Sequence, residues 1–378
     1  MKDQILVVGG YGHVGQTICK GLAAQFPGKV YAAGRSIDKA QAFSRSTGGR
    51  VLPMQIQINR PITPELLKPF KLVIICLDQQ DDTFMRLCLS LGIHYIDLSA
   101  NDAFLSQVEG LNETAAASGS TAVLSIGLAP GLTNLMAARA MMEMDHTDVI
   151  DITIMLGLGD RHGQAAIEWT IDNLAEDFEI VRDGGKTMVK SFTDGKRTDL
   201  GADIGWKKAY RFNFSDQHAL MRTLQLPSVS TRLCFDSSLV TDLLAFLRSI
   251  GLTRLLRLPF IRRLSIAMFG RLRFGSDRYA AKVEAWGSKS GEAVHVECLL
   301  HGHNEAQITG KTGAAIVELL LNENRHPAGV YHSHKLIQLD TLLPAIQEIL
   351  HFEMKVNNRT RKIFNGINLE GTAATITN

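Results

Sequence analysis

A glycine-rich segment near the start of the chain has the residue types that bind phosphate. It directly follows an apolar run, residues 5–8, and has the spacing G-x-G-x-x-G: Gly10, Tyr11, Gly12, His13, Val14 and Gly15. When such a loop joins a strand to a helix, its first glycine permits a tight turn, its second lets the backbone approach a pyrophosphate, and its third lets helix and strand pack closely. The first N–H groups of the helix then bind the phosphates. We therefore predict that these six residues bind a dinucleotide, since the strand–loop–helix context disfavours a plain structural turn.

The next predicted strand ends in residues that discriminate between two dinucleotides. About 20 residues beyond the glycines, an NAD-binding protein usually has an Asp or Glu that accepts hydrogen bonds from the adenosine ribose. This chain has Arg35 and Ser36 there, and Lys39 follows one helical turn later. Cations and a hydroxyl suit a ribose 2′-phosphate, whereas a carboxylate would repel it. We therefore predict NADP as the cofactor, with NAD less favoured; the alternative is that Arg35 only ends a strand in solvent.

Further candidate residues stand where later strands end, because ligands of doubly wound α/β folds bind at the carboxyl edge of the sheet. Leu77 ends one apolar run, and Gly127, Pro130 and Gly131 follow another, so we predict that these four residues contact the cofactor. Asn134 lies just beyond them and is the candidate for substrate binding. The alternative for this segment is a hinge between domains, and the two roles are compatible.

Asp97 is the candidate catalytic residue. It lies near the carboxyl end of a predicted strand, where it would hold a substrate ammonium group or steer a proton. One acid or base suffices for a reduction, because the cofactor supplies the hydride. His94 begins the same segment, so we expect it to lie far from the site.

A group of histidines and one acid in the second half raises the question of a metal. His295, Glu297 and His301 alternate along one predicted strand, with His303 close by. Residues two apart on a strand are separated by about 6–7 Å, so this spacing alone does not make ligands converge on one ion. We predict no metal and interpret the group as a solvent face or a subunit contact.

Residues 239–278 combine apolar side chains with arginine. Leucine and isoleucine recur in them at helical spacing, and the only acids are Asp242 and Asp277. Another subunit and a membrane surface both fit this composition. We favour the subunit interface and so expect a homodimer, with peripheral membrane contact as the alternative. The cations are Arg248, Arg254, Arg257, Arg262, Arg263, Arg271, Arg273 and Arg278.

The elements that must position these residues indicate an α/β protein. In the first third, short apolar runs alternate with helical patterns, which predicts a Rossmann doubly wound parallel sheet. The predicted strands are 5–8, 30–33, 72–77, 95–98 and 122–126, and the predicted helices are 17–25, 38–46, 81–91 and 101–118.

Beyond residue 148 the pattern changes to alternation with period two. A strand at 150–156 and a hairpin within 281–300 predict a second, α+β domain with a largely antiparallel sheet. We expect a Rossmann dinucleotide-binding domain at 1–132, an α+β substrate and oligomerisation domain at 133–307, and C-terminal elements at 308–378 that return to the Rossmann domain.

Composition and charge restrict the class of protein. The 40 Lys and Arg nearly balance the 38 Asp and Glu, which argues against a nucleic-acid partner. The five cysteines are scattered and form no C-x-x-C pair, as expected in a reducing compartment. No targeting segment is evident, and no apolar run approaches the roughly 18 residues of a membrane span. We expect a soluble cytoplasmic protein, at most peripheral to a membrane, that binds a small-molecule substrate.

Taken together, the motifs resemble the saccharopine dehydrogenase (saccharopine reductase-like) family. The resemblance rests on the glycine loop, on Gly34-Arg35-Ser36 and on the segments 92–97 and 127–134. It covers most of residues 1–140 and, more loosely, 302–330. Family members are typically NAD(P)-dependent enzymes that act at C–N bonds, such as saccharopine reductases, carboxynorspermidine dehydrogenase-like enzymes and lysine 6-dehydrogenases. A mycobacterial branch instead reduces a lipid enoyl group, and residues 33–39 are similar to that branch.

The resemblance implies an NADP-dependent oxidoreductase that transfers hydride at a C–N bond of an amino-acid-derived substrate. Two alternatives stay open. One is an enoyl or carbonyl reductase that acts on a lipid-like substrate at a membrane surface. The other is a non-catalytic NADP-binding scaffold or sensor.

Overall fold

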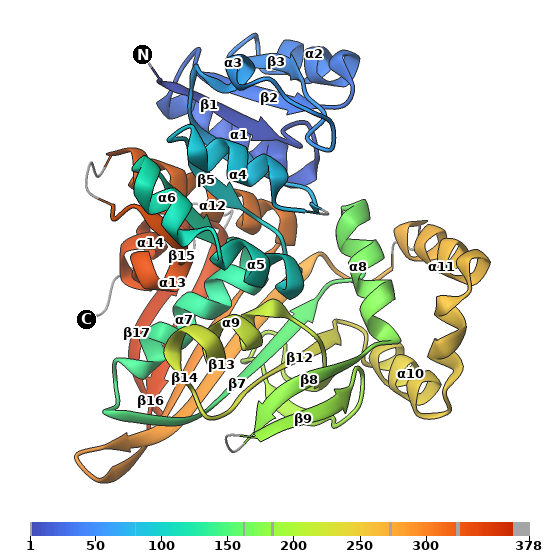
Figure 1. The fold of residues 1–378 in the computed structure, drawn as a ribbon. Coiled ribbons are helices and arrows are strands. Elements are labelled where there is room, and N and C mark those ends of the chain that lie inside the picture. The colour runs from blue at the N-terminus through green and yellow to red at the C-terminus, as the bar shows by residue number, and fades with distance from the viewer. Residues whose placement is uncertain are drawn as a thin grey trace. The chain divides into compact units, whose positions relative to one another are not determined.

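The computed structural model describes residues 2–79, 81–161, 163–182, 185–271, 274–322 and 326–365. The chain forms two compact units, each built around a sheet of its own (Figure 1). The first unit contains residues 1–132 and 306–338, and the second contains 133–305 and 339–378.

The sheet of the first unit has seven parallel strands in the order β15-β6-β5-β4-β1-β2-β3. The chain runs outward from β1 through β2 to β3, then continues from β4 on the other side of β1, so the order reverses between β1 and β4. This is the Rossmann arrangement that the first third predicts. The strands are β1 Gln4–Val8, β2 Val30–Gly34, β3 Val51–Gln55, β4 Phe70–Ile75, β5 His94–Asp97, β6 Thr121–Leu124 and β15 Gly329–His332.

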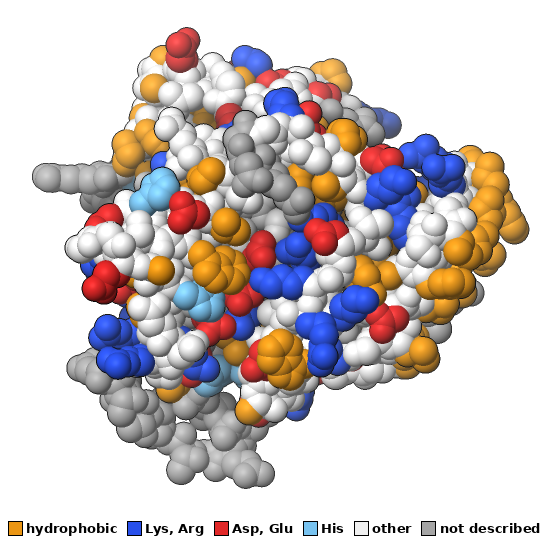
Figure 2. All heavy atoms as spheres, turned by 90° about the horizontal axis from the view of Figure 1, so that it is seen from below, with side chains coloured by type: hydrophobic (Ala, Val, Ile, Leu, Met, Phe, Trp, Pro, Cys, Tyr) orange, Lys and Arg blue, Asp and Glu red, His pale blue; other side chains and the backbone are white. Residues whose placement is uncertain are grey.

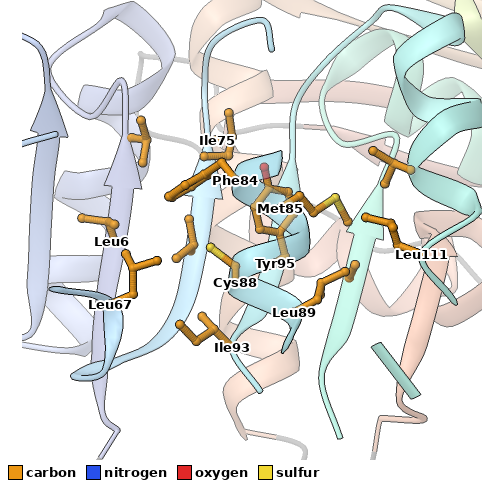
Figure 3. Packing of buried hydrophobic residues seen from close by; sticks show 14 of the residues in the cluster. Leu6, Leu67, Ile75, Phe84, Met85, Cys88, Leu89, Ile93, Tyr95 and Leu111 are labelled. Atoms are coloured by element: carbon orange, nitrogen blue, oxygen red, sulfur yellow. The ribbon is translucent and has the colours of Figure 1, made fainter. Parts of the chain in front are cut away.

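Both faces of this sheet are buried, because its strands are apolar on both sides. Figure 3 shows one face, where Leu6, Ile75 and Tyr95 pack against side chains of α4 such as Phe84 and Met85. The helices of this unit are α1 His13–Gln25, α2 Ile37–Ser46, α3 Pro64–Leu67, α4 Thr83–Ser90, α5 Asp102–Glu109, α6 Asn112–Ser118, η1 Leu128–Leu132, α12 Glu305–Asn322 and α13 Ser333–Leu336.

Helix α12 packs closely on α1, and small residues make this approach possible. A Cβ on Gly310 would lie 2.6 Å from Cβ of Thr17, and one on Gly313 would lie 3.2 Å from Cδ1 of Ile18. Together with β15, α12 returns residues from the far end of the chain to the first unit.

The second unit has a mixed sheet of eight strands in the order β10-β11-β12-β7-β13-β14-β16-β17. Its pairings are antiparallel except for β12 with β7, so the prediction of a largely antiparallel sheet is confirmed. The strands are β7 His146–Leu156, β10 Lys196–Asp199, β11 Trp206–Arg211, β12 Val229–Phe235, β13 Arg278–Lys289, β14 Glu292–His303, β16 Leu350–Val356 and β17 Arg359–Asn365, with a separate pair β8 Asp177–Arg182 and β9 Gly185–Lys190.

Helices α7 and α9 pack on this sheet, and α10 packs on β11 and β12. The helices are α7 Thr133–Met141, α8 Gln164–Leu174, α9 Ser215–Leu224, α10 Ser238–Ser249, η2 Leu252–Arg257, α11 Pro259–Arg271, α14 Leu339–Ile346 and η3 Gln347–Ile349. No helix among the described residues is long and apolar enough to cross a membrane.

The predicted role of residues 308–378 needs a correction. Residues up to Gln338 belong to the first unit, but the described residues 339–365 belong to the second. The reason is that β16 pairs with β14 and buries Phe352 and Met354 in the second sheet. Residues 366–378 lie outside the described part of the chain.

Candidate functional site

The glycine loop adopts the conformation that its sequence predicts. It leaves β1 at Val8 and enters α1 at His13, and the Gly12 N–H donates to the Gly9 carbonyl oxygen over 2.8 Å. A Cβ on Gly15 would lie 2.2 Å from that same oxygen, and one on Gly10 would lie 2.8 Å from Cα of Ala32. Gly10 and Gly15 are therefore required by the packing of the loop itself.

Gly12 is different, because the surrounding protein would nearly accommodate a side chain there. A Cβ on Gly12 would meet one atom, the Gly9 carbonyl oxygen, at 3.0 Å. Gly12 is also the N-cap of α1, and no side chain among the described residues caps this helix or places an acid in its first turn. The N–H groups of His13, Val14 and Gly15 thus start a helix whose positive end is available to an anion. A dinucleotide pyrophosphate fits this end of α1.

The end of β2 presents two cations and a hydroxyl. Arg35 and Lys39 are exposed, and neither forms an ion pair with a described residue. The Ser36 hydroxyl accepts a hydrogen bond from the Lys39 N–H over 3.3 Å and so caps α2, which leaves its own proton free to donate. Asp38 also lies in this first turn and is exposed. Arg35, Ser36 and Lys39 are thus available to a ribose phosphate.

Tyr11 links the glycine loop to the end of β2. Its hydroxyl accepts a hydrogen bond from the Ser36 N–H over 3.0 Å, and a Cβ on Gly34 would lie 2.4 Å from that hydroxyl. Tyr11 therefore fixes where Arg35 and Ser36 stand relative to α1. The glycine at position 34 is explained by this contact, which the sequence pattern did not reveal.

The loop after β6 lies at the carboxyl edge of the same sheet, as its position in the sequence predicts. Gly127, Pro130 and Gly131 are buried in it, and the neighbouring Leu128 N–H donates to the Thr309 hydroxyl over 3.1 Å. Leu77 follows β4 and is half-buried. These residues come from the edge at which the glycine loop also lies, so they are placed where a cofactor of this fold extends.

Asp97 ends β5 and is fully buried. One of its carboxylate oxygens accepts from Gln79 Nε2 over 2.7 Å, and the other accepts from the Ser99 N–H over 2.7 Å. Burial raises the pKa of Asp97 to about 7, although these donors oppose the shift. The group can therefore hold or release a proton near neutral pH.

His94 stands at the other end of β5 from Asp97. Its Nδ1 accepts a hydrogen bond from the Thr121 N–H over 3.1 Å, and burial lowers its pKa. The amino ends of β5 and β6 are held together by this bond. His94 is placed away from the carboxyl edge, as its position in the sequence predicts.

At the carboxyl edge, three side chains form a series of hydrogen bonds that the sequence did not predict. Ser125 Oγ lies 2.7 Å from His332 Nδ1, and His332 Nε2 lies 3.0 Å from a carboxylate oxygen of Glu109. Ser125 follows β6, His332 ends β15, and the two strands are neighbours in the sheet. This series of hydrogen bonds connects the buried edge of the sheet to the partly exposed Glu109. It therefore fixes the loop after β6 and offers a path for a proton. Ser125 and His332 are 207 residues apart in the sequence, so their contact becomes evident only from the pairing of β15 with β6.

In the second unit, Asn134 is fully buried near the start of α7. The same unit buries Asp216, whose carboxylate accepts from the Thr231 hydroxyl and from the Gln217 N–H, each over 2.7 Å. Burial raises the pKa of Asp216 to about 6. Asn134 stays the candidate substrate residue, and Asp216 joins it as a buried acid that sequence patterns did not single out.

The group of histidines considered for metal binding lies on the second sheet. His295 and Glu297 come together with Glu284 of the neighbouring strand, and ligand atoms of the three lie within 4.8 Å of one another. However, the Lys282 ammonium is 2.6 Å from Glu297 and 3.9 Å from Glu284. Lys196 also lies 3.2 Å from Glu284. Because two ammonium groups already pair with these two carboxylates, the group fits an ion-pair network better than a divalent cation.

Comparison with known proteins agrees with the geometry of the first unit. Residues 5–123 match the family described as the saccharopine dehydrogenase NADP binding domain. No curated protein matches the sequence. Among solved structures, the apo saccharopine dehydrogenase (L-Glu forming) from Saccharomyces cerevisiae matches with a TM-score of 0.63 and 14% sequence identity, over 93% of this chain and 99% of that one. The C. glutamicum DAP dehydrogenase in complex with DAP matches with a TM-score of 0.44 and 12% identity, over 89% of this chain and 95% of that one.

The similarity to the yeast enzyme establishes the fold of the chain. Residues 5–123, which belong to the first unit, are similar to the saccharopine dehydrogenase NADP binding domain. The glycine loop, the end of β2 and Asp97 all lie within this domain.

Proposed function

We propose that this chain, an oxidoreductase with an NADP-binding domain of the saccharopine dehydrogenase family, transfers hydride between NADP(H) and a C–N bond of an amino-acid-derived substrate. The observation that carries the proposal is the combination of an open α1 N-terminus with cations at the end of β2 that form no ion pair with a described residue. The first accommodates a pyrophosphate, and the second accommodates a 2′-phosphate. The family match supports the same cofactor.

The cofactor, when bound, supplies the hydride. This chain must then bind the cofactor, orient the substrate and supply a proton to it. The N–H groups of α1 hold the pyrophosphate, and Arg35, Ser36 and Lys39 hold the ribose phosphate. The residues after β6, among them Gly127 and Gly131, line the edge where the reacting ring extends.

Asp97 is the acid or base in this proposal. Reduction of an imine requires one proton on nitrogen, and oxidation of an amine requires its removal. A carboxyl group whose pKa is about 7 is suited to both directions at neutral pH. Its neutral form donates a proton, and its ionised form attracts a substrate ammonium group.

A second candidate is favoured by one observation. Residues 239–268 expose a row of large apolar side chains, including Leu239 at 80% and Phe260 at 77% exposure. A surface of this kind would suit an enoyl or carbonyl reductase that meets a lipid-like substrate at a membrane. The fold and the cofactor site are the same for both candidates, so only the substrate separates them.

The test is NADPH consumption by the purified chain with three substrate classes: cyclic and acyclic imines, 2-oxo acids paired with amino acids, and enoyl thioesters. We expect turnover with a member of the first two classes and its loss in Asp97→Asn. Turnover with enoyl thioesters alone would replace this proposal by the second candidate. NADPH binding without turnover in any class would indicate the non-catalytic scaffold or sensor. Asp102→Asn, an exchange of the same kind in the first turn of α5, serves as the matched control.

A further inference from the structure

Helix α10 is amphipathic, but its apolar face points away from the protein. Leu239, Leu243, Phe246 and Ile250 recur at intervals of four, three and four residues, so they share one face, and all four are more than half exposed. The opposite face carries Thr241 and is buried. A helix that packs only against its own domain buries its apolar stripe instead.

The buried face of α10 is held by polar contacts. The Arg248 guanidinium donates to the carbonyl oxygens of Ser191, Ala175 and Glu176 at 3.0, 3.1 and 3.0 Å, and it also binds the Asp177 carboxylate. The Thr241 hydroxyl accepts from the Phe235 N–H over 2.9 Å. These bonds fix the rotation of the helix, so the outward apolar face is a defined feature of the fold.

The two following elements repeat this arrangement. In η2, Leu252 and Leu255 are three residues apart, which places them along one edge of a 3₁₀ helix, and both are exposed. Leu258, the C-cap of η2, is exposed as well. In α11, three apolar side chains recur every four residues and are exposed as well. They are Phe260, Leu264 and Met268. Figure 2 shows hydrophobic side chains gathered at the edge of the molecule where α10 and α11 lie, with blue cations beside them.

We call these ten side chains the outer apolar face: Leu239, Leu243, Phe246, Ile250, Leu252, Leu255, Leu258, Phe260, Leu264 and Met268.

A cationic pocket opens beside the outer apolar face. It has a volume of about 480 Å³, and its lining includes Lys190, Arg254, Arg257 and Ile250, the last of which also belongs to the outer apolar face. The one acid in the lining is Asp177, which Arg248 already binds. Arg257 is 4.0 Å from Glu176, whereas Lys190 and Arg254 form no ion pair with a described residue. The pocket can therefore accept an anion.

We propose that the outer apolar face and this pocket dock the protein on a membrane surface that contains anionic phospholipid. The apolar side chains enter the interfacial layer, and a lipid phosphate occupies the pocket beside Lys190 and Arg254. Exposed apolar side chains flanked by cations are the composition of a helix that lies in a membrane interface. The docking does not depend on which substrate the chain reduces.

A second copy of the chain suits this surface less well. In a symmetric dimer the same surface patch lies on both sides of the interface, so Arg254 and Arg263 would face a partner surface with the same excess of cations. Within the described residues 239–271 the one acid is Asp242, which already accepts a hydrogen bond from the Tyr210 hydroxyl over 2.9 Å. Arg262 is likewise occupied, since it forms two bonds with Asp172 on α8. Like charges without added acids oppose self-association, whereas an anionic bilayer neutralises them.

The test is flotation of the full chain with vesicles of phosphatidylcholine alone and with vesicles that also contain phosphatidylglycerol, at low and high salt. We expect flotation with the anionic vesicles, weakened by salt because screening removes the charge contribution. Arg254→Glu reverses one cation and should reduce partitioning about 30-fold, since each charge near the surface contributes about fivefold. Leu243→Ser combined with Phe246→Ser should abolish flotation.

Two control variants make the same kinds of exchange at exposed positions of the second unit that lie outside the outer apolar face. Met142→Ser removes an apolar side chain that is 63% exposed, and Lys289→Glu reverses an exposed cation. Both should float like the unchanged protein. Light scattering and NADPH titration of every variant, without vesicles, report the oligomeric mass and the folded state.

A folded, NADPH-binding protein that does not float with anionic vesicles at low salt overturns the proposal. A dimer that Leu243→Ser with Phe246→Ser dissociates, without flotation of the unchanged protein, assigns the face to a second copy. Equal flotation with both vesicle types overturns the phosphate site. None of these results alters NADPH consumption measured without vesicles, so the proposed function is tested separately.

Discussion

The contrast between Gly12 and Gly15 separates the role of the glycine loop in folding from its role in binding. A Cβ on Gly15 would lie 2.2 Å from the Gly9 carbonyl oxygen and 2.7 Å from Gly10 Cα, and both are backbone atoms that cannot rotate away. On Gly12 it would meet one atom at 3.0 Å, and the backbone there, at φ −75° and ψ 177°, suits any residue. We therefore expect opposite effects from similar substitutions.

The magnitudes follow from these contacts. Gly15→Ala should lower the free energy of unfolding by about 3 kcal/mol, the upper end of the usual cost of overpacking, because backbone must shift. Gly12→Val should lower the free energy of unfolding by about 1 kcal/mol or less, because neither glycine nor valine at the N-cap accepts a hydrogen bond through its side chain. Its side chain would instead occupy the path of the pyrophosphate. The loss of two charge-assisted hydrogen bonds, worth about 1.5–3 kcal/mol each, should weaken NADPH binding more than about 100-fold.

The assay is urea denaturation of each variant, followed by fluorescence titration with NADPH. Gly28→Ala would not serve as a control, because Gly28 has a positive φ of 73°. Gly163→Ala is suitable, since open space surrounds its Cβ position and its φ is −64°. Near-normal NADPH binding by a folded Gly12→Val protein would refute the assignment of α1 as the phosphate site.

Three further predictions concern buried polar groups. Because burial raises the pKa of Asp97 to about 7, the folded protein keeps a proton that the unfolded chain loses near pH 3.8, the ordinary pKa of an aspartate. The free energy of unfolding should therefore fall by up to about 4 kcal/mol as the pH rises from about 4 to above 7, and denaturation curves of Asp97→Asn should lack that loss. If the unchanged protein and Asp97→Asn had parallel pH profiles, the raised pKa would be contradicted. His332→Leu leaves the buried Ser125 hydroxyl without its partner and should lower the free energy of unfolding by about 1–3 kcal/mol. The same exchange should have a smaller effect in a Ser125→Ala background, and strict additivity in this double-mutant cycle would show that the two residues do not interact. Arg248→Met removes the donor to three carbonyl oxygens and should cost at least about 3 kcal/mol in thermal or urea unfolding, and an unchanged stability would show that these bonds do not hold α10.

The local signals in the first third predict most of the first unit, because each strand there is a short apolar run bounded by turns. β1, β2, β4, β5 and β6 all appear within a few residues of the expected positions. The predicted helix at 101–118 is two helices, since the chain turns at Gly110 between α5 and α6. Asn101 caps the first of them by accepting from the Ala103 and Phe104 N–H groups.

Two strands of this sheet have no clear local signal. β3 contains Pro53 and lies at the edge of the sheet, where a missing N–H is tolerated but the alternation is weak. β15 has four residues after Pro327, a segment that the sequence pattern marks as a break. Its partner, β6, is about 200 residues away, and a pairing of that separation leaves no trace in local periodicity. The contact of Ser125 with His332 depends on this pairing, so the sequence alone could not reveal it.

Periodicity likewise finds a helix without showing which face is buried. The spacing of Leu243, Leu247 and Ile250 predicts α10, and an apolar stripe normally faces the core. The structure instead exposes Leu243 and Ile250 and buries Arg248. The rotation depends on carbonyl acceptors just before β8, at Ala175 and Glu176, and just after β9, at Ser191. These are distant from α10 in sequence, so side-chain spacing could not predict it. Arg273 lies outside the described residues, and the side chain of Arg271 is not described.

We propose that the first unit binds NADP through the cations at the end of β2. The most direct test of this proposal is the dissociation constant of NADPH and of NADH for the unchanged protein and for Arg35→Ala. We expect NADPH to bind more tightly than NADH by about tenfold to a hundredfold, because charge-assisted hydrogen bonds are worth about 1.5–3 kcal/mol, and we expect Arg35→Ala to reduce that ratio clearly. Equal affinities for the two cofactors, or a preference that Arg35→Ala leaves intact, would contradict it.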